Sequence, residues 1–336
     1  MKILVTGGAG FIGSHTVVEL IKNKFHPIIV DDLRNSKGFI IDNINKITGT
    51  KIPYYAIDFG DKLKLSEVFK KEKPEGIIHF AADKAVNESI NNPLKYYHNN
   101  LSNLVNLLSL VDKFKVKSFV FSSSCTVYGL PDKIPVSEGA TIKEAASPYG
   151  FTKQVGEKIL SDFFKTIPNS SLAHLRYFNP IGAHPSGLIG ELPIGLPSNL
   201  IPYVTQTAIG KRDCLTIHGN DYNTEDGTCI RDYIHVVDLA SAHVLTLNNL
   251  FENSENLILN VGTGNGSSVL KIVDRFQEVN NIKLKYKFGP RRSGDVPVMY
   301  ADNSLICEKI NWSAKFSLDD CLVHSWKWEN NLGLSK

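Results

Sequence analysis

A tyrosine and a lysine four residues apart, Tyr149 and Lys153, have the spacing of a proton-abstracting pair. A phenol has a pKa of about 10 and is a poor base at neutral pH unless a cation lies nearby. Residues four apart share a helix face, and a cation at about 4 Å with an effective dielectric constant of 20 offers about 3 pKa units. We expect the Lys153 ammonium to bring the Tyr149 phenol near the working pH, against the opposing effect of desolvation.

The spacing alone is weak evidence, because a lysine-rich chain with 12 tyrosines contains about one such pair by chance. Its position is more informative. Three serines, 122–124, follow an expected strand, and Ser147 with Pro148 begins an expected helix that contains the pair. Ser124 is then placed to hydrogen-bond the hydroxyl that Tyr149 deprotonates. The alternative is that these serines only end a strand and cap a helix.

A glycine cluster near the N-terminus, Gly7, Gly10 and Gly13, follows an expected strand and opens an expected helix. Such a loop lets the backbone approach a pyrophosphate, which the N–H groups of the helix bind. Asp31 and Asp32 end the second strand about 20 residues on, where a carboxylate accepts a bond from a ribose hydroxyl and repels a 2′-phosphate. This pattern favours an NAD site over an NADP site and over an ordinary turn.

Later strand ends are expected at the same edge of the sheet, because ligands bind at the carboxyl ends of parallel strands. Asp58 ends the third expected strand and is placed to meet the adenine; a helix-capping role for it stays open. Small residues, Ala81 and Ala82, follow the fourth strand and allow the backbone to approach the cofactor.

The elements that position these residues alternate between strand and helix in the first half of the chain. Apolar runs predict strands, and helical spacing with Pro93 at a first turn predicts helices. The expected strands are 2–6, 28–30, 52–57, 76–80 and 117–121, and the expected helical segments are 11–22, 61–71 and 93–114. This alternation predicts an α/β fold, a Rossmann-type doubly wound parallel sheet covered on both faces.

The alternation stops near residue 179, and Gly and Pro are frequent from 180 to 202. Strand and helix pieces resume at 233–250, 257–261 and 267–279. We expect residues 1–178 to form an NAD-binding Rossmann domain, with returning segments near 230–262. Residues 179–336 should form mainly a smaller C-terminal α/β lobe that binds the substrate.

Composition excludes several classes of protein. The 336 residues are 42% hydrophobic and 21% charged, with a net charge of +3 that is not gathered into a basic run, so no nucleic-acid partner is expected. No segment approaches the ~20 apolar residues of a membrane span or has the form of a signal peptide. The five cysteines are far apart, which argues against disulfides and a metal site. A cytoplasmic location is expected.

Together these residues give a recognisable pattern: the chain resembles the UDP-glucose 4-epimerases, within the extended short-chain dehydrogenase/reductase superfamily. The resemblance covers nearly the whole chain. The superfamily motifs are residues 5–15, 121–129 and 149–153, and the motifs typical of sugar-nucleotide epimerases are 176–184, 224–235 and 291–295.

The resemblance implies a set of binding residues. Its NAD contacts are Phe11, Ile12, Asp31, Asp32, Leu33, Arg34, Asn35, Ser36, Asp58, Phe59, Phe80, Ala81, Ala82, Asp83, Lys84, Asn99, Ser124, Tyr149, Lys153 and Phe178. Its UDP-sugar contacts are Ser124, Tyr149, Asn179, Asn199, Leu200, Thr216, Ile217, His218, Arg231, Arg292, Ser293, Gly294, Asp295 and Met299. Fixed guanidinium groups suit a pyrophosphate, and a surface ion pair is the alternative for Arg231 and Arg292.

By the same resemblance, the chain is an isomerase of galactose metabolism that interconverts UDP-galactose and UDP-glucose through a transient 4-keto sugar, as a homodimer joined by the helices of Asn99 and Tyr149. Asp32, Asp83 and Cys125 depart from the family pattern, where Asn, an apolar residue and Ala are common. Met299 stands where side-chain size limits the sugar pocket. Methionine is bulky but flexible, so we expect a preference for glucose and galactose over N-acetylated sugars.

Two alternatives remain. A sugar-nucleotide 4,6-dehydratase of this fold needs an Asp-Glu pair after the fifth strand, and residues 123–126 read Ser-Ser-Cys-Thr. A non-catalytic NAD-sensing protein has no need of Ser124, Tyr149 and Lys153, which are all present. Both alternatives are disfavoured.

Overall fold

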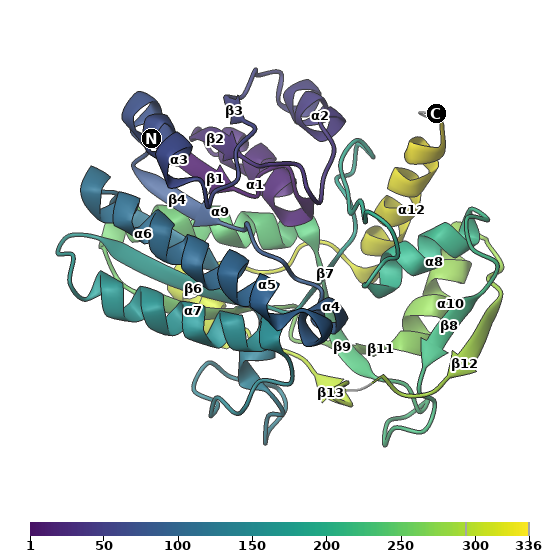
Figure 1. Ribbon diagram of the computed structural model, residues 1–336. Helices are drawn as coiled ribbons and strands as arrows, with labels where there is room; N and C mark the ends of the chain where they lie inside the picture. The colour runs from purple at the N-terminus through teal and green to yellow at the C-terminus, as the bar shows by residue number, and fades with distance from the viewer. Residues whose placement is uncertain (293, 335–336) are drawn as a thin grey trace.

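A computed structural model describes residues 1–292 and 294–334 of the chain. Its large sheet has seven strands in the order β10-β6-β5-β4-β1-β2-β3, all parallel (Figure 1). These strands are β1 (Lys2–Thr6), β2 (His26–Val30), β3 (Tyr54–Tyr55), β4 (Gly76–His79), β5 (Ser118–Ser122), β6 (Ser171–Tyr177) and β10 (Leu257–Val261). The expected Rossmann-type sheet is therefore confirmed.

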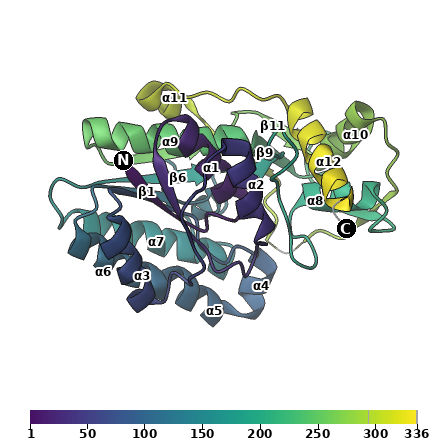
Figure 2. The same cartoon turned by 90° about the horizontal axis from the view of Figure 1, so that it is seen from above.

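Helices cover both faces of this sheet (Figure 2). One face has α1 (Phe11–Lys22), α2 (Phe39–Thr48), α9 (Val236–Asn253) and the short α11 (Ser304–Ile310). The other has α3 (Lys62–Glu72), α4 (Val86–Asn91), α5 (Pro93–Tyr97), α6 (Asn103–Phe114) and α7 (Pro148–Phe164). Successive side chains of a strand point to opposite faces, so Ile3 and Val5 pack with Leu239 on one side and Leu4 packs with Leu107 on the other.

A second, smaller lobe is built on other strands and helices. In its sheet β9 (Ile230–His235) pairs with β7 (Asn179–Ile181), β11 (Gly266–Ser268) and β13 (Val298–Met299), and β8 (Leu215–His218) pairs separately with β12 (Tyr286–Gly289). Its helices are α8 (Leu200–Ala208), α10 (Val269–Asn280) and α12 (Leu318–Leu334). Val204, Ile272 and Leu322 belong to its apolar core.

Several elements differ from expectation. The run 52–57 pairs only at β3, because this strand is the sheet edge and only its two residues meet β2. The segment 93–114 is divided by a π-helical turn, η1 (His98–Ser102), between α5 and α6. A 3₁₀ turn, η2 (Cys125–Tyr128), follows β5 and was not predicted. β9 joins the smaller sheet, whereas α9 and β10 lie with the large one.

Within the described part of the chain, no helix has both the length and the apolar character needed to cross a bilayer. The same residues contain no cluster of three His, Cys, Asp or Glu side chains placed to hold a metal ion. The five cysteines are free.

Candidate active site

The glycine loop, residues 7–13, is packed too tightly for side chains at two positions. Gly7 has φ +70°, and a Cβ there would lie 2.8 Å from the backbone nitrogen of Ala81. A Cβ on Gly13 would lie 2.2 Å from the carbonyl oxygen of Gly7. Gly10 caps α1 without a side-chain bond, so the first N–H groups of α1, at Phe11 and Ile12, have no side-chain cap and are free to bind an anion. The loop therefore fits a dinucleotide pyrophosphate.

Asp31 connects the glycine loop to the turn after β2. Its carboxylate accepts bonds from the backbone nitrogens of Ala9, at 3.0 Å, and Leu33, at 2.8 Å. Ser36 lies in the same turn and donates to the Ala9 carbonyl at 2.6 Å, while Asn35 is exposed. Burial raises the pKa of Asp31, and the backbone donors oppose that rise. This carboxylate thus holds the shape of the loop in which NAD is expected.

Arg34 brings together three predicted cofactor residues. Its guanidinium pairs with Asp32 at 2.5 Å and with Asp58, and it donates to the Asn99 side chain at 3.1 Å. The capping alternative for Asp58 is wrong, because Asp61 accepts the capping bond of α3. A free arginine near the ribose suits a 2′-phosphate, but the two carboxylates neutralise this one. The arrangement fits NAD.

The end of β4 places the aromatic residues of the predicted NAD site. The Phe80 ring lies 4.7 Å from the ring of His243, and the Phe59 ring lies 5.2 Å from that of His79. Ala81 and Ala82 follow Phe80, and a Cβ on Gly7 would lie 2.8 Å from the Ala81 backbone nitrogen, so this segment passes close to the glycine loop. The approach of its backbone to the cofactor stays a prediction.

Asp83 is the unusual residue of this segment. It is 4% exposed, and both its backbone N–H and its carbonyl bond to the Asn100 side chain. Its carboxylate lies 4.0 Å from the Lys95 ammonium, and burial raises its pKa. Asn100 also donates to Thr152 of α7 at 3.1 Å. Asp83 therefore pairs with Lys95 of α5, while its backbone is tied to the helix of Tyr149.

Ser124, Tyr149 and Lys153 meet where β5 ends. Ser147 caps α7 by accepting from the Gly150 backbone at 3.1 Å. The Lys153 ammonium donates to the Ser122 carbonyl at 2.6 Å and lies 5.9 Å from the centre of the Tyr149 ring. Ser124 caps η2, and its hydroxyl interacts with the Tyr149 phenol. The capping interpretation of Ser124 is therefore confirmed, and its role toward the sugar hydroxyl stays a prediction.

Burial dominates the electrostatics of this pair. Tyr149 is 7% exposed, and burial raises its pKa, with smaller increases from Tyr177 and Cys125 and a decrease from Ser124. Burial also lowers the pKa of Lys153 to about 8. Desolvation therefore opposes the expected effect of Lys153 on the phenol, and the lowering of the phenol pKa by Lys153 together with a nicotinamide charge stays a prediction. Burial thus favours the neutral phenol form of Tyr149.

An apolar cluster lies beside η2 and includes two predicted contacts, Phe178 of the cofactor set and Met299 of the substrate set. Cys125, the first residue of η2, packs against it. Met299 is also the register partner of Arg231 across β13 and β9. The residue expected to limit the sugar pocket therefore lies between the catalytic turn and a predicted phosphate-binding arginine.

Asp295 links the two predicted phosphate-binding arginines. Its carboxylate lies 3.7 Å from the Arg231 guanidinium and 3.0 Å from that of Arg292. Both arginines are therefore in ion pairs, as the alternative expected. The shared carboxylate also fixes both guanidinium groups. Gly294 has φ +79°, and a Cβ there would lie 3.8 Å from the Ala146 carbonyl oxygen just before α7, whereas Ser293 lies outside the described residues.

The remaining predicted substrate contacts come from three elements. Thr216, Ile217 and His218 form most of β8, and His218 lies 3.2 Å from the Pro290 carbonyl beside the arginine segment. Asn199 and Leu200 begin α8, and Asn179 begins β7. Asn199 donates at 2.6 Å to the same Glu191 oxygen that lies 3.3 Å from Lys84. Glu191 thus joins a predicted cofactor residue to a predicted substrate residue.

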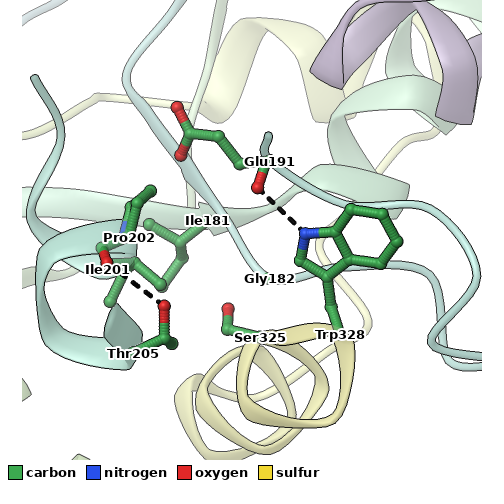
Figure 3. A pocket seen from close by; sticks show the side chains of 8 residues that line it. All are labelled: Ile181, Gly182, Glu191, Ile201, Pro202, Thr205, Ser325 and Trp328. Atoms are coloured by element: carbon green, nitrogen blue, oxygen red, sulfur yellow. Dashed lines mark hydrogen bonds between the residues drawn. The ribbon is translucent and has the colours of Figure 1, made fainter. Parts of the chain in front are cut away.

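A small cavity opens between α8 and α12, with Thr205, Ser325 and Trp328 in its lining (Figure 3). The Trp328 indole donates to the Glu191 carbonyl at 2.9 Å. The predicted catalytic residues are absent from its eight lining residues. This cavity is therefore separate from the Ser-Tyr-Lys centre.

Three residues of the site were missed from the sequence: Asn100, Glu191 and Glu157, whose carboxylate accepts from the Ser123 hydroxyl at 2.5 Å. Glu157 follows Lys153 by four positions, so helical spacing could have found it. Asn100 is next to the predicted Asn99. Nothing in the Gly- and Pro-rich segment distinguishes Glu191.

Comparisons with known proteins agree with this geometry. The model of the GDP-mannose 4,6 dehydratase family matches residues 4–324. The UDP-glucose 4-epimerase of Dictyostelium discoideum is 48% identical over 330 residues, covering 98% of this chain and 96% of that protein. That of Bacillus subtilis is 46% identical over 331 residues, covering 98% and 97%.

Solved structures give the same result. The UDP-glucose 4-epimerase of Stenotrophomonas maltophila, with bound NAD and formylated UDP-arabinopyranose, superposes with a TM-score of 0.97 at 43% identity over 100% of both chains. The enzyme of Bifidobacterium longum, in complex with NAD⁺ and UDP, has a TM-score of 0.96 at 40% identity over 98% of both chains. This chain therefore belongs to the UDP-glucose 4-epimerase family of the extended short-chain dehydrogenase/reductases.

Proposed function

We propose that this chain is an NAD-dependent isomerase that interconverts UDP-galactose and UDP-glucose by inverting C4 of the hexose. The observation that supports this most is that Ser124, Tyr149 and Lys153 meet at the carboxyl end of β5. The glycine loop follows the carboxyl end of β1, at the same edge of the parallel sheet. Proteins named UDP-glucose 4-epimerase match this chain over 98% of its length.

The residues that would hold the cofactor are the glycine loop, Asp31, the Arg34 cluster and the end of β4. NAD, when bound, supplies reversible two-electron chemistry, so that no net oxidation of the sugar occurs. The Asp31 carboxylate keeps its hydrogen bonds from backbone N–H groups in this arrangement. The pairing of Arg34 with Asp32 and Asp58 leaves this guanidinium neutralised and poorly suited to a 2′-phosphate.

Tyr149 moves the proton. As a phenolate, a form that the positive charge of bound NAD would favour together with Lys153, its Oη takes the proton of the C4 hydroxyl in one half-reaction and returns it in the other. Ser124 already accepts from the Thr126 backbone at 3.2 Å, so its own proton is available for the sugar oxygen. Lys153, held by the Ser122 carbonyl, supplies an ammonium beside the phenol below a pH of about 8.

The smaller lobe would bind UDP. Arg231 and Arg292 offer guanidinium groups to the pyrophosphate, and their shared carboxylate, Asp295, holds them in place. Binding energy far from C4 retains the oxidised sugar while the sugar ring stays free to turn over. The bulk of Met299 near this end supports a preference for glucose and galactose over N-acetylated hexoses.

A 4,6-dehydratase is the nearest alternative, and the matching family model has such an enzyme in its description. That reaction needs an additional acid and base, and the turn after β5 offers Ser123, Ser124, Cys125 and Thr126. Burial raises the pKa of Cys125 to about 12, which makes this thiol a poor acid–base group. The epimerase is favoured.

Homodimerisation belongs to the same proposal. Three apolar side chains are exposed on neighbouring helices: Leu94 of α5 is 76% exposed, Val105 of α6 is 51% and Phe151 of α7 is 47%. A second copy would cover them through these helices. Size-exclusion chromatography with light scattering should show a dimer, and Val105→Asp with Phe151→Asp should yield monomers.

The division of the chain is also proposed: residues 1–178, with the return of α9 and β10, bind NAD, and residues 179–336 mainly bind the UDP-sugar. A cytoplasmic location is proposed too, supported by the five free cysteines.

The experiment for the proposed activity uses purified full-length chain and UDP-galactose. UDP-glucose as the product, with NAD in the denatured protein, supports the proposal. A 4-keto-6-deoxy product would indicate a dehydratase, and bound NAD without turnover would indicate a sensor.

A further inference from the structure

Glu157 is buried one helical turn beyond Lys153 and has no role in the mechanism above. It lies on α7 and is 6% exposed. Its carboxylate accepts from the Ser123 hydroxyl at 2.5 Å and from two nitrogens of Arg176, at 2.9 and 2.6 Å. Every contact of this carboxylate is therefore to a group near the catalytic turn or to the arginine that pairs with it.

Arg176 fixes the position of Glu157 from the side of β6. This arginine is 3% exposed, and it also donates to the Tyr128 hydroxyl at 3.2 Å. Tyr128, in η2, donates in turn to Asn260 at 2.6 Å. Buried ion pairs cost desolvation energy and are weak evidence for stability alone, so the location of this pair suggests another use.

The three serines after β5 have separate partners. The Ser122 carbonyl accepts from the Lys153 ammonium at 2.6 Å, the Ser123 hydroxyl donates to Glu157, and Ser124 faces Tyr149. Glu157 therefore holds the middle residue, whose two neighbours contact the catalytic lysine and the catalytic tyrosine. A shift at Ser123 would move both neighbours.

Glu157 also faces Lys153 electrostatically, because residues four apart share a helix face. The other titratable groups that face Lys153, Glu157 or Tyr149 include His79 on β4, His174, Arg176 and Tyr177 on β6, and Tyr128 on η2. Burial lowers the pKa of His79 to about 3 and of His174 to about 4, and raises those of the tyrosines. Glu157 is thus the anion of this group.

We propose that Glu157 is a positioning residue for the epimerase reaction: its carboxylate fixes Ser123, and through it Ser122 and Ser124, while its charge keeps Lys153 an ammonium. The inference rests on the proposed function. Glu157 thus determines two properties of the centre: the placement of the three serines after β5 and the pH range in which Lys153 is charged.

The charge is tested by Glu157→Gln, which keeps an oxygen acceptor for Ser123 and removes the negative charge. Opposite charges about 6–8 Å apart at an effective dielectric constant near 20 shift a pKa by about one to two units. The alkaline limb of the kcat profile for UDP-galactose should move down by about one to two pH units. Arg176→Lys, which disturbs the same buried pair but keeps both charges, should leave this limb in place.

The contact is tested by Ser123→Ala, which keeps the charge and removes the hydroxyl. We expect kcat to fall about tenfold with little change in KM, because a misplaced catalytic group costs rate more than binding, and the alkaline limb should stay where it is in the parent. Glu157→Asp, with a shorter reach and the same charge, should behave like Ser123→Ala.

If the alkaline limb of the kcat profile of Glu157→Gln coincides with the limbs of the parent and of Arg176→Lys, the claim that the Glu157 charge keeps Lys153 an ammonium is overturned. If both Ser123→Ala and Glu157→Asp have the kcat of the parent, the claim that the Glu157 carboxylate fixes Ser123 and its neighbours is overturned. If Glu157→Gln does not fold, Glu157→Asp decides: reduced kcat with an unmoved limb supports the inference, and an unchanged kcat overturns it. A parent without epimerase activity would instead refute the proposed function.

Discussion

Tyr149→Phe removes one oxygen atom from the proposed base and leaves the ring in place. The side chain is 7% exposed, and the phenol is in its neutral form at neutral pH because burial raises its pKa. The variant therefore loses no buried charge. We expect a change in unfolding free energy within about 1 kcal/mol, the net value of one ordinary hydrogen bond.

The effect on turnover should be much larger. Proton transfer by a positioned side chain contributes about 10²–10⁴-fold, which corresponds to about 3–5.5 kcal/mol of the activation barrier. The glycine loop and the Arg34 cluster do not depend on the phenol oxygen, so bound NAD should remain. Loss of several orders of magnitude in kcat with full NAD content is the expected outcome.

The assay measures UDP-glucose formed from UDP-galactose, and NAD released on denaturation gives the cofactor content. Tyr177→Phe is the matched control: it removes another phenol oxygen, half-buried and bonded to the Ser122 hydroxyl at 2.9 Å, and should cost less than about tenfold. Activity of Tyr149→Phe within tenfold of the parent would refute the assigned base.

Three further predictions concern the cofactor loop, cofactor choice and pH. Gly13→Ala should abolish NAD retention, because the new Cβ would lie 2.2 Å from a backbone oxygen of the glycine loop; Gly139→Ala, with open space around it, is the control and should retain NAD. Asp58→Asn should free Arg34 from one carboxylate and raise NADP affinity by about tenfold in a binding titration, since guanidinium groups bind phosphates well. Burial lowers the pKa of Lys153 from 10.5 to about 8, so the unfolded chain binds more protons between these values and stability should rise with pH there, while kcat, which needs the ammonium, should fall. Melting temperatures of the parent and of Lys153→Met, measured from pH 7 to 10.5, should show the parent gaining relative to the variant.

Each of these has a clear contrary result. Full NAD content in Gly13→Ala would show that the loop tolerates a side chain. Unchanged NADP affinity in Asp58→Asn would show that Arg34 does not face the ribose. A constant difference in melting temperature between the parent and Lys153→Met across the pH window would show that Lys153 is not desolvated.

Elements with strong local patterns could be predicted from the sequence. The bounds of β1, α1 and β10 match the expected ranges, because apolar strands and helical spacing extend over each element. The π-helical turn η1 interrupts a continuous helical pattern, and no local residue type marks it. The run 52–57 is shortened by its place at the sheet edge, which depends on strand order and not on composition.

The site shows the same division. Tyr149, Lys153 and Ser124 were predicted because their order along the chain and the helical spacing are local properties. The balance of their pKa values could not be predicted, because desolvation depends on how deeply Tyr149 is buried, and spacing does not report depth. Bonds such as Arg34 to Asp58 and Asn199 to Glu191 join segments whose proximity appears only in the folded chain.

Two of the connections between the lobes are very short. β6 ends at Tyr177 and β7 begins at Asn179, so one residue separates the large sheet from the small one. β9 ends at His235 and α9 begins at the next residue, where the His235 ring accepts from the Val237 backbone at 3.0 Å. Connections this short leave little room for a hinge. The proposed reaction must present both faces of the sugar ring to the cofactor. With little hinge motion between the lobes, we expect the sugar itself to rotate within the site.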